Sequence, residues 1–152
     1  MLITGREDLG SGTKSFVPQP RHFQTRQGVF EQKKWLYTGS TANATPAALT
    51  PDPENEPLDA NSAYAFEGLV VAGVSGGGNA QAYRVQGCVK KGAANANTAL
   101  VGSPLVTAYE NDAGADLGIT ADTTNGRLIL TATGVAATNI NWRAELSFIK
   151  VA

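Results

Sequence analysis

Residues 139–151, N-I-N-W-R-A-E-L-S-F-I-K-V, constrain the fold of this chain more than any other stretch. Apolar and polar side chains alternate along it, and the apolar set is Ile140, Trp142, Ala144, Leu146 and Phe148. An alternation of period two with one apolar face is typical of a half-buried β-strand. Because a shift of one residue would move Trp142 from the core into water, we expect a long strand whose register is tightly fixed.

Other strand-forming segments recur at intervals of about ten residues, as in antiparallel sandwiches and barrels. They are residues 33–38, 47–50, 63–74, 80–90, 98–101, 105–110, 117–121 and 127–133. Three glycines separate the hairpin strands of residues 64–90, and Asn125-Gly126 is a strong hairpin turn signal. No segment has helical periodicity, so we predict an all-β protein of about seven to nine antiparallel strands. Of the two architectures we prefer a jelly-roll-like β-sandwich, with residues 64–90 and 139–151 at the centres of its two sheets.

Residues 1–32 differ from the rest, because glycine, proline and scattered charge interrupt any periodicity. This segment nevertheless contains Phe16, Val17, Phe23, Val29 and Phe30. A disordered tail usually lacks so many large apolar side chains. We therefore predict an extended N-terminal arm over residues 1–32, which packs on a sister subunit, on another protein or on its own core, followed by a β-domain over residues 33–152.

Charge and composition exclude several classes of function. The net charge of −1 gives no positive field for binding nucleic acid through its phosphates. No apolar run approaches the roughly 18 residues of a membrane helix, and the N-terminus does not resemble a signal peptide. Cys88 is the only cysteine, which excludes an internal disulfide or a cysteine-based zinc site. We expect Cys88 to be a buried small side chain.

No catalytic group of residues is apparent. His22 is the single histidine and lies in the arm, outside the predicted core. Most carboxylates lie in turns, and only Glu67 and Glu145 lie in the middle of predicted strands, where an outward-facing charge is the usual role. The turn that contains Asp112 and Asp116 lacks the spacing of a calcium-binding EF-hand. We predict a protein that is not an enzyme, without catalytic residues, cofactor or metal.

Several short motifs resemble the β-domains of bacteriophage tail-fibre and virion appendage proteins. They are N-S-A-Y-A-F-E-G-L-V-V-A at 61–72, A-L-V-G-S-P at 99–104, A-D-T-T-N-G at 121–126, and T-G at 133–134 followed by N-W-R-A at 141–144. R-H-F at 21–23 and G-V-F at 28–30 resemble the segment before the domain, so the likeness covers residues 20–152. The closing strand departs from the family pattern, because Arg143 follows Trp142 where an arginine usually precedes the tryptophan.

The resemblance implies a non-enzymatic structural protein of the virion, made in the host cytoplasm and forming a homotrimer. Because no shaft or repeats precede the domain in this chain, we expect a capsid decoration (cement) protein or a small tail-fibre module. The arm would anchor it to the major capsid protein or to a tail protein. In such an assembly Arg143 and Glu145, on the polar face of residues 139–151, are candidates for a subunit interface.

The alternative is a receptor- or carbohydrate-binding module that recognises a glycan on the host surface. Exposed aromatic rings stack on sugars, and the candidates are Tyr37, Tyr83 and Tyr109, although all three lie on alternating strands where a core or interface position is more common. A glycan-cleaving enzyme would need two carboxylates facing each other across a cleft, and the sequence shows no such pair.

Overall fold

The computed structural model describes residues 31–52 and 57–151. The predicted arm residues Phe16, Val17, Phe23, Val29 and Phe30 lie outside the described residues, as does His22. The described chain forms ten strands and one short 3₁₀ helix. The strands are β1 (Glu31–Thr41), β2 (Ala47–Ala48), β3 (Thr50–Asp52), β4 (Ser62–Val74), β5 (Ala80–Lys91), β6 (Thr98–Leu100), β7 (Leu105–Glu110), β8 (Asp116–Asp122), β9 (Arg127–Thr133) and β10 (Ile140–Val151), and the 3₁₀ helix is Asn95–Asn97.

All strand pairs are antiparallel, which confirms the predicted all-β antiparallel class. The described part of the chain has ten strands, one more than the predicted seven to nine. The extra strand is present because residues 47–50, predicted as one strand, contribute to two sheets. β2 pairs with β9, whereas β3 pairs with β1, and the change of partner occurs at the buried Leu49. Pro51 fits in β3 because β3 is an edge strand, where a missing backbone donor is tolerated.

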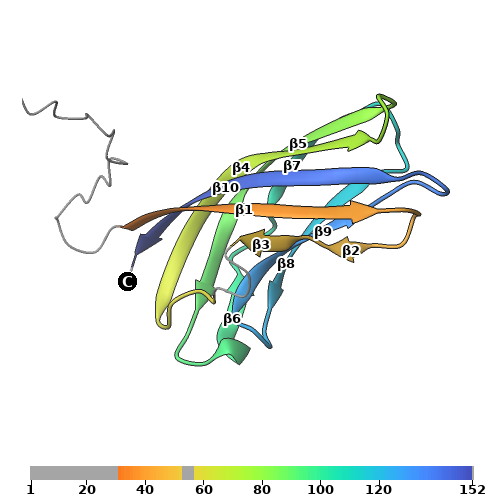
Figure 1. The fold of residues 1–152 in the computed structure, drawn as a ribbon. Coiled ribbons are helices and arrows are strands. Elements are labelled where there is room, and N and C mark those ends of the chain that lie inside the picture. The colour runs from red at the N-terminus through yellow and green to blue at the C-terminus, as the bar shows by residue number, and fades with distance from the viewer. Residues whose placement is uncertain (1–30, 53–56, 152) are drawn as a thin grey trace, which may run out of the picture.

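The strands form a curled seven-stranded sheet and a three-stranded sheet. The larger sheet has the order β3-β1-β10-β4-β5-β6, with β7 also paired to β5, and the smaller has the order β2-β9-β8. In Figure 1, β10 lies between β1 and β4. The pairing of β10 with β4 extends from Ile140–Val74 to Val151–Ala63.

The prediction that the hairpin 64–90 and residues 139–151 occupy the centres of two different sheets is wrong. β4, β5 and β10 all lie in the seven-stranded sheet. β5 hydrogen-bonds to one edge of β4, so the other edge needs a second long partner to satisfy its backbone groups. β10 has the matching length, and the short strands β2, β8 and β9 are left to cover the apolar face.

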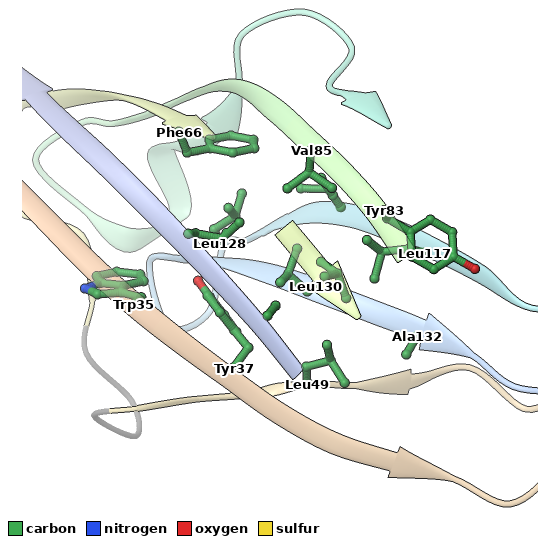
Figure 2. Close-up of a cluster of buried hydrophobic side chains, with 14 of the residues drawn as sticks. Trp35, Tyr37, Leu49, Phe66, Tyr83, Val85, Leu117, Leu128, Leu130 and Ala132 are labelled. Atoms are coloured by element: carbon green, nitrogen blue, oxygen red, sulfur yellow. The ribbon is translucent and has the colours of Figure 1, made fainter. Parts of the chain in front are cut away.

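The core lies between the two sheets (Figure 2). Ile140, Trp142, Ala144, Leu146 and Phe148 of β10 are all buried, as the alternation predicts. The indole N–H of Trp142 donates to the Thr41 hydroxyl at 3.0 Å, and its ring stacks on Tyr83 with a centroid distance of 5.9 Å. These contacts hold the register of β10, because a shift of one residue would break both and would expose the indole.

Two turns match their sequence signals. Gly76 and Gly77 have φ values of +89° and +86° in the turn between β4 and β5, a backbone region that suits glycine. In the turn between β8 and β9, the Asp122 carboxylate accepts hydrogen bonds from the backbone N–H groups of Thr124 and Asn125 at 2.9 and 3.0 Å. Burial raises the pKa of Asp122, but hydrogen bonds from Asn125, Thr124 and Arg127 outweigh it and lower the pKa overall.

Within the described residues, no helix is long and apolar enough to cross a membrane.

Candidate interaction surface

The seven-stranded sheet has a second face, turned away from the core, on β1, β10, β4, β5 and β7. We call this surface the outer face. Strand register aligns its side chains in rows across the five strands. One row is Leu36, Glu145, Leu69, Arg84 and Thr107, and the next is Thr38, Arg143, Val71, Ala82 and Tyr109. A third row is Lys34, Ser147, Glu67, Gln86 and Leu105.

The outer face is apolar over much of its area. Every large apolar side chain that is exposed in residues 31–52 and 57–151 belongs to it or continues it: Leu36, Leu69, Val71, Val101, Leu105, Tyr109, Ile149 and Val151. Leu69 and Val71, at the centre on β4, are 66% and 57% exposed. Scattered apolar residues on a surface are ordinary, but their concentration on one face is typical of an interaction site.

Charged side chains flank this apolar centre on both sides. On the β10 side, Glu145 accepts a hydrogen bond from the Lys34 ammonium at 2.7 Å, and both side chains are more than half exposed. On the β5 side lies Arg84. In the part of the chain that the structure describes, neither Arg84 nor Arg143 forms an ion pair or a side-chain hydrogen bond. The outer face therefore presents charges of both signs, with two guanidinium groups available to a partner.

Shallow hollows lie between the protruding side chains of the outer face. One, with a volume of about 870 Å³, has Leu36, Leu69 and Val71 among its lining residues and reaches the edge strand β3 at residues 50–52. Arg143 and Glu145 also line it. A smaller one, of about 450 Å³, lies around Leu69 and is bounded by both Glu145 and Arg84. The face is thus uneven enough to interlock with another surface.

The predicted interface residues Arg143 and Glu145 both lie on the outer face and are exposed. Sequence reasoning assigned them as a polar strip and missed the apolar residues beside them. A signal was present, because residues 69–74 are almost continuously apolar. Such a run is typical of a strand covered on both faces, and here the second face is formed by Leu69 and Val71.

The three candidate sugar-stacking tyrosines differ in access. Tyr37 and Tyr83 are each 1% exposed, and within the described residues their hydroxyl groups have no hydrogen-bond partner. Burial raises the pKa of both phenols. Tyr109, by contrast, is 64% exposed on the outer face. Of the three, Tyr109 alone presents its ring to solvent.

The remaining candidate residues have local roles. Asp112 accepts a hydrogen bond from the Gly114 backbone N–H at 3.0 Å, and Asp116 accepts one from the Leu117 N–H at 2.7 Å. The described residues contain no group of three or more histidine, cysteine or carboxylate side chains placed to hold a metal. Glu67 is exposed on the outer face, as predicted. The expectation that Cys88 is buried is wrong: it is partly exposed, because on β5 the even-numbered positions face outward.

A polar cluster at one end of β4 and β10 holds a loop in place. The Lys150 ammonium lies 2.8 Å from the Asp59 carboxylate, which also accepts a hydrogen bond from the Tyr64 hydroxyl at 2.8 Å. The hydrogen bond from Lys150 is the main reason why the pKa of Asp59 is lowered. Burial raises the pKa of Tyr64 to about 12. These groups satisfy one another, which indicates a structural role.

A scan of protein-family models, a search of curated proteins and a search of solved structures each find no match to this chain.

Proposed function

We propose that this chain is a non-enzymatic structural protein of a bacteriophage virion, either a capsid decoration (cement) protein or a small tail-fibre module. The two sheets form a jelly-roll-like sandwich, the protein assembles as a homotrimer, and residues 1–32 anchor it to the major capsid protein or to a tail protein. It is made in the host cytoplasm and functions in the virion.

The observation that carries this proposal is the outer face. A surface that concentrates the exposed apolar side chains of the domain, with charges of both signs around them, suits permanent contact with other subunits better than it suits water. The motif resemblance of residues 20–152 to virion appendage domains supports the same conclusion. So does the apolar content of residues 1–32, which an anchoring segment would bury.

The test compares the isolated protein with the assembled particle by limited trypsin digestion. Residues 1–32 contain cleavage sites at Arg6, Lys14, Arg21 and Arg26. We expect rapid cleavage at these sites in the isolated protein and protection in the particle, as measured by mass spectrometry. Cleavage at Arg84, in the middle of β5, serves as an internal control and should be slow in both states. Equal protection of the arm in both states would contradict the anchoring role.

A second candidate function is recognition of a glycan on the host surface, and the observation that favours it is the exposed Tyr109. An aromatic ring at 64% exposure offers a flat apolar surface on which a sugar ring can stack. Binding of the protein to a glycan array that is lost in Tyr109→Ala, but kept in Thr107→Ala on the same strand, would favour this function. An array without binding at high protein concentration would exclude it.

A further inference from the structure

The outer face of the seven-stranded sheet is about as large as a standard protein interface. Five strands spaced about 4.8 Å apart, and about nine residues of about 3.4 Å each along β10, give on the order of 700 Å² in projection. A stable complex of standard size buries about 800 Å² of accessible surface on each partner. The projected area is close to this value, so the outer face alone approaches the size of a standard interface.

The charges on this face complement one another across β4. Glu145 and Arg84 lie on opposite sides of Leu69, because Leu69 is the register partner of Glu145 on β10 and of Arg84 on β5. Within one chain they are separated by two strand spacings, about 9.6 Å, and no ion pair joins them in the described residues. Consider a rotation axis that is parallel to β4 and runs in front of the outer face. Rotation about it leaves the position of each residue along the strand direction unchanged. Such an axis brings the β10 side of one copy against the β5 side of another.

We propose that further copies of this chain dock on the outer face, with the threefold axis of the proposed homotrimer parallel to β4 and Glu145 of each copy paired with Arg84 of its neighbour. Leu69 and Val71 then meet their own counterparts at the axis. Arg143 lies at the height of Tyr109 of the neighbour, since both occupy the row of Val71. An arginine over an exposed tyrosine ring is a favourable cation–π contact.

A competing arrangement has a twofold axis that runs parallel to the sheet and perpendicular to its strands, at the level of Ala144. It would bring Arg143 over Glu145 of the other copy and would leave Arg84 without a partner. The two arrangements are distinguished by which pair of charge reversals restores assembly.

This inference rests on the self-association in the proposed function, but its test needs only isolated protein, so its failure leaves the trypsin result on the particle unaffected.

The test measures association by sedimentation velocity for the full chain and for variants whose folding is checked by circular dichroism. We expect the parent protein to assemble at micromolar concentration. Arg84→Glu and Glu145→Arg should each raise the dissociation constant at least about tenfold, because like charges then face each other. The double variant should restore assembly to within about threefold of the parent value. Arg84→Gln should give a smaller change in the same direction.

Lys90→Glu is the matched control, because it makes the same charge change on β5 and on the same face, beyond the three rows described above. It should leave the dissociation constant within about threefold of the parent value. A monomeric parent protein, single reversals without effect, or restoration by Arg143→Glu/Glu145→Arg instead of the first pair would each overturn the proposal.

Discussion

At the scale of single residues, Gly68 shows how closely the long strands approach one another. A Cβ atom at this position would collide with the Glu145 carbonyl oxygen and would lie 2.9 Å from the Leu146 Cα. Backbone atoms cannot move aside without disturbing the pairing of β4 with β10. The sequence marks Gly68 only as a glycine within a strand, which is a weak signal for a close approach of two backbones.

We predict that Gly68→Ala lowers the free energy of unfolding by about 3 kcal/mol or more, because the added methyl group forces β4 away from β10. Gly73→Ala, on the same strand, is the matched control. Nothing lies within 4 Å of a Cβ atom there, so its effect should stay within about 0.5 kcal/mol. Urea unfolding followed by circular dichroism measures both. Equal losses in the two variants would contradict this account of Gly68.

Lys91 illustrates a residue role that sequence reasoning could not supply. Lysine at the end of a hairpin strand is usually exposed, yet Lys91 is 7% exposed and donates a hydrogen bond to the Leu58 carbonyl oxygen at 2.7 Å. The Leu58 backbone N–H in turn donates to the carbonyl oxygen of Gly126 at 2.8 Å. These contacts join segments far apart in the chain, so no local pattern could indicate them.

At the scale of elements, β10 is the strand that the sequence predicts best. From Ile140 to Phe148 its buried and its exposed side chains follow from strict alternation, because one face meets a core and the other does not. The alternation ends there, and the apolar side chain of Ile149 is exposed. Its partners could not be predicted in the same way. Period two determines which side chains share a face but not which strand lies alongside, so the sequence alone does not place β10 in the same sheet as β4 and β5.

The alternation along β10 predicts opposite responses of two adjacent residues. Trp142→Ala should lower the free energy of unfolding by about 3–5 kcal/mol, because it leaves a cavity beside Tyr83 and removes the hydrogen bond to Thr41. Asn141→Ala, which alters an exposed side chain, should change it by less than about 0.5 kcal/mol. Urea unfolding at low protein concentration measures the free energy of unfolding of both variants without a contribution from assembly. Comparable effects would mean that the register of β10 is wrong.

At the scale of the whole molecule, the main feature is that the larger sheet carries exposed apolar residues on its outer face, away from the core. A seven-stranded sheet packed on a three-stranded one has more surface than its own chain covers. Sequence alternation identified the polar residues Arg143 and Glu145 on this surface. It did not reveal that β4 and β7 contribute Leu69, Val71 and Tyr109 to the same face, because that depends on the order of strands in the sheet.

In the proposed assembly about an axis along β4, Glu67 is an unfavourable residue. This side chain lies on the outer face of β4, in the row of Ser147 and Gln86, so its copies approach one another near the axis. Glu67→Gln should therefore lower the dissociation constant of the assembly by about two- to fivefold and raise its thermal midpoint at a given concentration. Sedimentation velocity and concentration-dependent thermal unfolding measure these effects.

At high salt the difference between variant and parent should shrink, because screening weakens the repulsion between the carboxylates. Unchanged or weaker assembly of Glu67→Gln at low salt would exclude this axis, since the perpendicular alternative brings Glu67 opposite the uncharged Gly73 of the other copy.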